Sequence, residues 1–263
     1  MSSQKPSPFN LDPAPKVITF DCYGTLVQWY EVLLREIETT LVGHGVQDVD
    51  APAIFDSFSA QGRHLTAEKP HRLYKDILRA GFKAAFREHG VPLSEGDLNR
   101  IAASPMTMGP HPDVPDALNL LREHYKLAIF TNSDNDLIAP TVARIGVPFD
   151  YVITAEQAQA YKPSRQLFEY GYRTMEVAPE ETVHVAMGMY WDMKARHELG
   201  LRGIWVGAVS AANPVRRAAP AVASPAAAPV SSPARGMVNK IARAFTSKGN
   251  AAVAVSNESW EEF

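Results

Sequence analysis

Five short apolar runs constrain the fold of this chain more than any other feature of its sequence. Within each run hydrophobic residues follow one another with little alternation, which is typical of parallel strands that helices cover on both faces. The runs occupy residues 17–20, 127–130, 151–154, 183–187 and 203–206. We therefore predict five buried, mostly parallel strands.

Helical patterns fill the intervals between these runs, most clearly at residues 115–125, 137–145, 164–175 and 193–199. Alternating strands and helices are the signature of βαβ units. The predicted fold class is therefore α/β, with a doubly wound, mostly parallel sheet.

Residues 29–108 interrupt this rhythm, because they show helical periodicity throughout and no clear strand. Open α/β sheets bind ligands beyond the carboxyl ends of their strands. We predict that this insertion forms a helical cap over that edge. The core domain then comprises residues 16–28 and 109–207, preceded by a loose arm over residues 1–15.

The composition changes near the C-terminus. Between residues 211 and 235, 18 of 25 residues are Ala, Pro or Ser, which favours a linker over residues 208–235. Residues 236–263 begin with a short basic pattern that has an apolar residue at every fourth position, as in an amphipathic helix. Docking of this helix on the domain and binding to a partner or an anionic surface both stay open.

Composition and charge narrow the classes of function. A formal net charge of −3 over 263 residues gives no reason to expect a nucleic-acid partner. The single cysteine, Cys22, excludes an internal disulfide and fits a reducing compartment. The N-terminus lacks the apolar stretch of a signal peptide, and no run reaches the roughly 18 apolar residues of a membrane span. We expect a cytoplasmic protein without a membrane span.

Polar residues follow the predicted strands in four places. They lie at residues 21–25 (DCYGT), 131–134 (TNSD), 161–163 (YKP) and 188–192 (GMYWD). Because the carboxyl ends of parallel strands meet at one edge of a sheet, we expect these stretches to converge on one small volume.

The order and spacing of these motifs resemble the haloacid dehalogenase (HAD) superfamily, and more narrowly its L-2-haloacid dehalogenase (type II) hydrolases. The motifs are Asp-x-Tyr-Gly-Thr-Leu at residues 21–26, Thr-Asn at 131–132, Lys-Pro at 162–163 and Trp-Asp at 191–192. The resemblance covers roughly residues 16–207. It implies a metal-independent hydrolase that displaces halide from a small 2-haloalkanoic acid through a covalent aspartyl ester, giving a 2-hydroxy acid.

The resemblance assigns catalytic roles to Asp21, Lys162 and Asp192. Asp21 is the expected nucleophile, since a carboxylate can form an ester and divide one difficult step into two. Lys162 is expected to lower the pKa of Asp21 and keep it ionised, and Asp192 to orient or activate the hydrolytic water. Ordinary structural alternatives are a helix cap for Asp21, an exposed lysine for Lys162 and a helix N-terminal carboxylate for Asp192.

Cys22 and Tyr23 follow the expected nucleophile and are both counted as substrate-binding candidates. Superfamily phosphatases carry a second aspartate at the position of Tyr23, where it handles the leaving-group proton. A tyrosine is too weak an acid for that task at neutral pH, whereas a halide leaves without a proton. Adjacent residues point in opposite directions, so we expect the Cys22 thiol to face the core.

Five further residues are candidates for substrate binding. Thr131 and Asn132 are expected to bind the substrate carboxylate or the leaving group, with plain turn chemistry as the alternative. Trp191 is expected at the wall of the site, and Phe168 stands where the family has a tyrosine. Arg63 in the cap is the favoured cation to cradle a departing halide, and an ordinary surface arginine is the alternative.

The chain departs from the family in its fourth motif, where Met187 and Met189 replace a serine and an asparagine. Magnesium-dependent members of the superfamily have an aspartate at the position of Met189. No cofactor is therefore expected, although Asp21 and Asp192 leave magnesium open, since one or two carboxylates can suffice for that ion. No zinc-binding spacing is present, and His184, inside an apolar run, is expected to pack in the core.

Three alternatives to the haloacid reaction stay open. The first is attack on another activated carbon, such as ring-opening of a small strained amino acid. The second is a magnesium-dependent phosphatase, which Tyr23 and Met189 oppose. The third is an interaction module with weakened catalysis, which the altered fourth motif and the C-terminal segment favour. The expected partner is a small carboxylic acid, and a homodimer is left open.

Overall fold

The computed structural model describes residue 11 and residues 13–207. The linker and the basic helix predicted for residues 208–263 lie outside the described residues, as does most of the N-terminal arm. The predicted domain boundaries therefore stay predictions.

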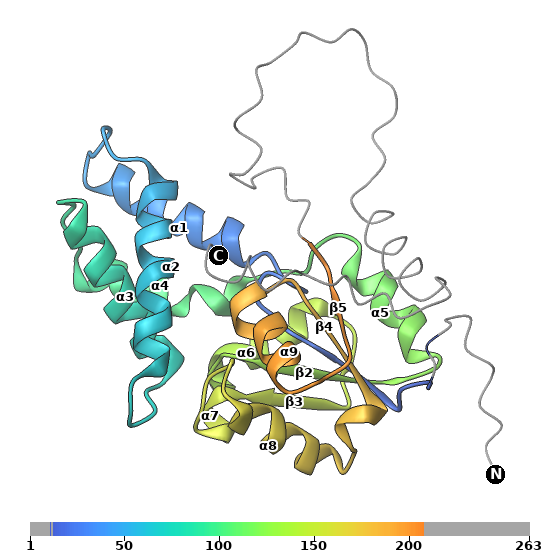
Figure 1. The fold of residues 1–263 in the computed structure, drawn as a ribbon. Helices are drawn as coiled ribbons and strands as arrows, with labels where there is room; N and C mark the ends of the chain where they lie inside the picture. Colours follow the sequence, from blue (N-terminus) through green and yellow to red (C-terminus); the bar gives the residue numbers. More distant parts are fainter. Residues whose placement is uncertain (1–10, 12, 208–263) are drawn as a thin grey trace, which may run out of the picture.

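A five-stranded parallel sheet forms the core, in the order β3-β2-β1-β4-β5 (Figure 1). The strands are β1 Val17–Phe20, β2 Lys126–Thr131, β3 Tyr151–Thr154, β4 Thr182–Ala186 and β5 Gly203–Trp205. The predicted parallel α/β fold is confirmed, and each apolar run forms a strand within one residue of its predicted bounds. Every residue of β1 and β4 is buried, as expected for central strands with both faces covered.

The chain winds outward from β1 in two directions. It first builds β2 and β3 on one side, then returns to place β4 on the other side of β1, and continues to β5. Strands β1 and β4 therefore border the point where the winding reverses. Open α/β sheets bind their ligands in the crevice at such a point.

Helices connect the strands of the core. They are α5 Val114–Arg122, α6 Asn135–Ile145, α7 Ala155–Ala158, α8 Arg165–Met175 and α9 Lys194–Glu198, with the 3₁₀ helix η2 Pro179–Glu181 and the π-helix η3 Met189–Met193. The single helix predicted near residues 193–199 is thus a π-helical segment followed by a short α-helix. π-Helical turns are rare and frequently lie at functional sites, and η3 carries Asp192.

Four helices follow β1 and precede α5 in the sequence. They lie together beside the sheet and form what we call the helical unit (Figure 1). They are α1 Trp29–Gly43, α2 Ala51–Ala67, α3 Tyr74–Glu88 and α4 Glu95–Ala103, followed by the 3₁₀ helix η1 Ser104–Thr107. The rings of Phe58 and Phe82 stack between α2 and α3, with centroids 4.0 Å apart. The expectation that this unit works as a cap stays a prediction.

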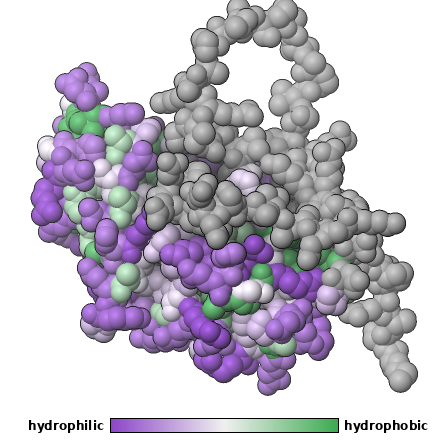
Figure 2. Space-filling model, viewed as in Figure 1, coloured by the Kyte–Doolittle hydropathy of each residue, from purple (hydrophilic) through white to green (hydrophobic). Residues whose placement is uncertain are grey.

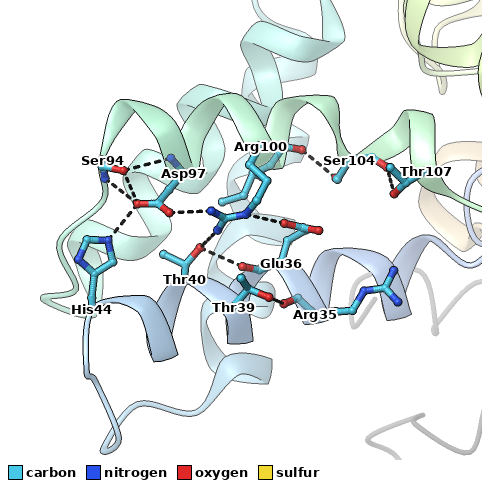
Figure 3. A network of polar contacts seen from close by, with 11 residues as sticks. Arg35, Glu36, Thr39, Thr40, His44, Ser94, Asp97, Arg100, Ser104 and Thr107 are labelled. Carbon is cyan, nitrogen blue, oxygen red and sulfur yellow. Dashed lines mark hydrogen bonds and ion pairs between the residues drawn. The ribbon is translucent and has the colours of Figure 1, made fainter.

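An ion network centred on Arg100 joins α4 to α1 (Figure 3). Arg100 donates to Glu36 at 2.8 Å, to Thr40 at 2.6 Å and to Asp97 at 2.9 Å. Asp97 also lies 2.9 Å from His44. Partial burial would raise the pKa of Asp97, but hydrogen bonds from the N-cap serine, His44 and Arg100 hold it well below its usual range. The network therefore fixes the first and the last helix of the unit against each other.

Asp134, at the N-cap of α6, ties the helical unit to the core. Its carboxylate accepts hydrogen bonds from the main-chain N–H groups of Tyr74, at 2.6 Å, and Lys75, at 3.0 Å. It thereby caps the N-terminus of α3, where a negative charge is favourable. The Tyr161 hydroxyl adds a hydrogen bond to the Arg72 carbonyl at 2.7 Å. The helical unit is thus anchored at the edge of the sheet where β2 ends.

Hydrophilic residues predominate on the face shown in Figure 2, and hydrophobic residues form only small groups there. Among the described residues, large hydrophobic side chains are exposed at Val42, Leu120 and Trp205. The described helices include none with the length and apolar character needed to cross a bilayer. Cytoplasmic location and a homodimer stay predictions.

Candidate active site

Lys162 lies between two carboxylates at the carboxyl ends of the strands. Its Nζ atom is 2.8 Å from Asp21 Oδ1 and 2.6 Å from Asp192 Oδ1, and it donates to the Phe130 carbonyl at 2.9 Å. All three N–H donors of the ammonium are therefore used. The side chain is only 1% exposed. The structure thus brings the three predicted catalytic residues into direct contact.

Asn132 positions the main chain of Lys162. The Lys162 N–H donates to Asn132 Oδ1 at 2.6 Å, and Asn132 Nδ2 donates to the Lys162 carbonyl at 3.2 Å. Because Asn132 directly follows β2, this pair of bonds fixes Lys162 to the sheet. The side-chain amide of Asn132, which the sequence predicts to bind substrate, is therefore hydrogen-bonded to Lys162.

Thr25 supports the second oxygen of Asp21. Its hydroxyl donates to Asp21 Oδ2 at 2.6 Å and accepts the Met187 N–H at 3.0 Å. Gly24 makes the turn between them with a φ of 84°, a conformation that glycine adopts readily. Both oxygens of Asp21 are thus oriented, and its side chain is 10% exposed.

The buried charges perturb one another. Burial raises the pKa of Asp21; Lys162 opposes this shift and Asp192 adds to it. Lys162 lowers the pKa of Asp21, as predicted, but desolvation outweighs this attraction and the pKa is raised overall. Burial would also raise the pKa of Asp192, but Lys162 and His184 hold it below its ordinary value. Asp192 is thus the more acidic carboxyl, and the pKa of Lys162 is raised by the two carboxylates against the effect of burial.

His184 belongs to this cluster, although the sequence predicts only a packing role. It is 1% exposed, with Nε2 3.0 Å from Asp192 Oδ1 and Nδ1 2.8 Å from Thr19 Oγ1. The only signal in the sequence is a polar ring inside an apolar run. Its partners depend on the register that places His184 beside Thr19 in the neighbouring strand.

Tyr23 follows Asp21 by two residues, and its hydroxyl meets that of Ser133. The two hydroxyl oxygens are 2.8 Å apart, and the Tyr23 ring stacks on Tyr74 with a centroid distance of 5.8 Å. Burial raises the pKa of Tyr23 well above its ordinary value. Tyr23 is therefore a neutral phenol near neutral pH and a poor general acid for an alkoxide.

Three substrate-binding candidates are fully buried. Cys22 lies in the core, where burial, with a further contribution from Asp21, raises the pKa of its thiol well above the ordinary value. Phe168 meets the His184 ring edge-on at 5.5 Å. Thr131 ends β2, and its hydroxyl has no hydrogen-bond partner within the described part of the chain. Their roles toward a substrate stay predictions.

Arg63 reaches η3 from the helical unit. Its guanidinium carbon lies 5.0 Å from the ring centroid of Tyr190, and Lys194 Nζ lies 5.3 Å from the same ring. Trp191 meets Tyr190 edge-on at 4.7 Å. The contact of Arg63 joins α2 to the segment that carries Asp192. The expectation that Arg63 cradles a halide stays a prediction.

The donor set does not fit a magnesium ion. The Lys162 ammonium stands between Asp21 and Asp192, in contact with both, and Met189 at the start of η3 offers no oxygen ligand. Magnesium requires oxygen ligands in a near-octahedral arrangement. Across residues 13–207, no three His, Cys, Asp or Glu side chains are grouped to hold a metal.

Comparisons with known proteins relate the chain to hydrolases. Residues 15–200 match the family model for haloacid dehalogenase-like hydrolases. Haloacetate dehalogenase H-2 from Moraxella sp. (strain B) is 29% identical over 115 residues, or 43% of this chain and 51% of that protein. The match thus spans about half of that relative's length. (S)-2-haloacid dehalogenase H-109 of Pseudomonas putida is 22% identical over 200 residues, covering 72% of this chain and 84% of the relative.

A solved structure of an L-2-haloacid dehalogenase has a TM-score of 0.64 to this fold at 25% identity. The alignment covers 73% of this chain and 84% of that one. The shared fold extends over most of the described residues.

Proposed function

The chain belongs to the haloacid dehalogenase-like hydrolases, and from that premise we propose that its substrate is a small 2-haloalkanoic acid. In this proposal Asp21 displaces the halide and forms a covalent ester, which water cleaves to a 2-hydroxy acid. The relatives named haloacetate dehalogenase and (S)-2-haloacid dehalogenase support this substrate class.

The observation that carries the proposal is the contact of Lys162 with both Asp21 and Asp192. Two carboxylates and one ammonium leave one uncompensated negative charge in a buried site. Esterification of Asp21 removes that charge and leaves one ammonium paired with one carboxylate. The raised pKa of Asp21 also implies a more basic, less solvated nucleophile.

The reaction has two steps. In the first, an Asp21 oxygen bonds to C2 of the acid as the carbon–halogen bond breaks, and the bonding pair leaves with the halide. In the second, water attacks the acyl carbon of the ester and gives a proton to Asp192. The bond from that acyl carbon to the ester oxygen then breaks, and Asp192 returns the proton to the departing 2-alkoxide. Asp21, left as a carboxylic acid, releases its remaining proton to water and becomes a carboxylate again. The lowered pKa of Asp192 keeps it ionised and able to accept that proton.

Tyr23 favours displacement at carbon over phosphoryl transfer. A phosphate monoester releases an alkoxide that needs a proton, and Tyr23 is a neutral phenol held against Ser133. A halide needs no proton. The residue two positions after the nucleophile therefore suits a halide leaving group.

Halide release from racemic 2-chloropropionate tests the proposal. We expect turnover that survives EDTA. In a single turnover in ¹⁸O-labelled water, we expect the label in the Asp21 carboxylate and not in the product, because water attacks the acyl carbon. Mass spectrometry of the peptide that contains Asp21 measures this incorporation.

Three other results would each contradict the proposal. Magnesium-dependent release of phosphate from p-nitrophenyl phosphate, without halide release, would indicate a phosphatase. Label found in the hydroxyl of the product would indicate direct attack by water at C2. A lack of turnover on a panel of 2-haloacids would favour another activated carbon or an interaction module.

Gly188→Ala is expected to lower turnover by about 10²-fold, the effect of moving a reacting group by roughly 1 Å. A Cβ atom at Gly188 would clash with Asp192 Oδ2, so the carboxylate must shift from the position in which it contacts Lys162. Gly43→Ala is the control, because a Cβ there meets nothing within 4 Å. Unchanged halide release in Gly188→Ala would show that the position of Asp192 is unimportant.

A further inference from the structure

His184 is a buried polar group that the reaction described above does not use. It is the central residue of β4, and the ring lies among Thr19 of β1, Phe130 of β2 and Phe168 of α8. Both ring nitrogens have a partner: Thr19 at Nδ1 and Asp192 at Nε2. A buried imidazole with two defined partners is held in one orientation.

The partners of His184 define its tautomer. Asp192 has a lowered pKa and is a carboxylate, which only accepts hydrogen bonds. The proton of the pair therefore lies on Nε2, which donates to Asp192 Oδ1. In the neutral ring Nδ1 is then the acceptor, and the Thr19 hydroxyl donates to it at 2.8 Å. Asp192 thus selects the tautomer, and the Thr19 hydroxyl, which can donate or accept, completes it as the donor to Nδ1.

Asp192 depends on few donors. Its Oδ1 atom contacts Lys162 Nζ at 2.6 Å and His184 Nε2 at 3.0 Å. Phe168, which borders His184, has no polar group to offer. Lys162 is shared with Asp21, so a change in the charge of the nucleophile acts directly on it. His184 is anchored in a central strand and is independent of Asp21.

We propose that His184 is a positioning residue that holds Asp192 while the aspartyl ester is hydrolysed. Its role rests on the proposed function of Asp21 and Asp192. When Asp21 is esterified it no longer carries a charge for Lys162, so the ammonium keeps Asp192 and the Phe130 carbonyl as its partners and loses its contact with a charged nucleophile. The chain of hydrogen bonds from Thr19 through His184 then keeps Asp192 aimed at the water. The second step depends on this chain and the first step does not.

His184→Phe tests the inference, because phenylalanine keeps the ring contacts and removes the donor. We expect ester hydrolysis to slow about 10- to 100-fold, less than the roughly 10²- to 10⁴-fold contributed by a whole general base. Ester formation should stay unchanged, so kcat and KM fall together and kcat/KM is retained. After rapid acid quench, mass spectrometry should reveal accumulated ester on Asp21.

His184→Gln is the matched rescue variant, because its amide N–H can replace Nε2–H, and it should restore most of the hydrolysis rate. Thr19→Val keeps His184 but removes the donor to Nδ1, and we expect partial ester accumulation. This variant decides the question if His184→Phe does not fold.

Failure of the inference and failure of the proposed function give different results. If the wild-type enzyme forms an ester, and folded His184→Phe or Thr19→Val hydrolyses it at the wild-type rate, the positioning role is wrong and the function stands. Equal losses in His184→Phe and His184→Gln would also overturn the role, since a packing defect explains them. If the wild-type enzyme forms no ester from 2-chloropropionate and other 2-haloacids, the proposed function fails and the role of His184 fails with it.

Discussion

Asp21→Asn is expected to reduce halide release by a factor on the order of 10⁴–10⁶, the effect of losing a covalent nucleophile. Asparagine has nearly the shape of aspartate and can still accept a hydrogen bond from Lys162 and contact Thr25. The loss would therefore arise from the missing negative charge. Halide release and the absence of an ester at residue 21 are the measurements.

The same substitution is expected to leave the free energy of unfolding unchanged or to raise it near neutral pH. Burial raises the pKa of Asp21, so the native state binds more protons than the unfolded state between the ordinary and the raised pKa. Stability then falls as pH rises through this window. The free energy of unfolding that Asp21→Asn gains over the wild type should be greatest at a pH above the raised pKa of Asp21. This gain should disappear as pH falls below the ordinary pKa of an aspartate.

Urea denaturation of Asp21→Asn and the wild type, from below the ordinary pKa of aspartate to above the raised pKa of Asp21, measures this difference in stability. Asp136→Asn is the control, because Asp136 is 65% exposed and pairs only at the surface with Lys75. A folded Asp21→Asn protein that retains halide release would remove Asp21 from the mechanism. A variant less stable than the wild type at neutral pH would show that Asp21 contributes stability, contrary to its raised pKa.

Lys162→Met is expected to lower the free energy of unfolding by about 3–5 kcal/mol, the cost of leaving buried charges without their partner. Methionine fills most of the volume of the lysine side chain, but Asp21 and Asp192 would then face each other without a cation. This loss is a large part of the roughly 5–15 kcal/mol that stabilises a typical domain. Halide release should also be lost, because Asp21 loses its orienting donor.

The loss in free energy of unfolding caused by Lys162→Met should grow as pH rises. Lys162 lowers the pKa of both carboxyl groups, so its removal raises both values in the native state. The variant then takes up protons on folding, and its stability falls as pH rises through the raised values. Urea unfolding at mildly acidic and mildly alkaline pH measures the difference.

Two comparison variants separate the causes of this loss. The double variant Lys162→Met/Asp192→Asn removes one of the two negative charges that repel each other, and it should recover part of the lost free energy of unfolding. Lys75→Met breaks a surface ion pair and should cost at most about 1 kcal/mol. If the double variant is no more stable than Lys162→Met, charge repulsion is not the cause.

The local sequence predicted the strands and the edge where the site lies. Apolar runs such as Val17–Phe20 need no knowledge of the rest of the chain, because burial on both faces requires continuous hydrophobicity. Parallel strands then bring Asp21 and Asp192 to one edge by geometry alone. The sequence therefore predicted the meeting of residues that lie far apart in the chain.

Tertiary structure decided what each side chain does at that edge. Asn132 positions Lys162, and Arg63 packs on Tyr190, because these partners depend on how loops and the helical unit dock on the core. The pKa of Asp21 rises because the depth of burial, which no motif reveals, outweighs the attraction of Lys162.

By itself the sequence determined the parallel sheet and the set of polar residues that its carboxyl edge collects. The register between β1 and β4 placed His184 beside Thr19, and η3 brought Asp192 to its other ring nitrogen, which its apolar surroundings in the sequence did not suggest. Hydrophobic periodicity is a property of neighbouring residues, whereas hydrogen-bond partners and desolvation arise only when distant segments pack. The local pattern therefore determined the fold and the place of the site, and long-range packing determined its electrostatics.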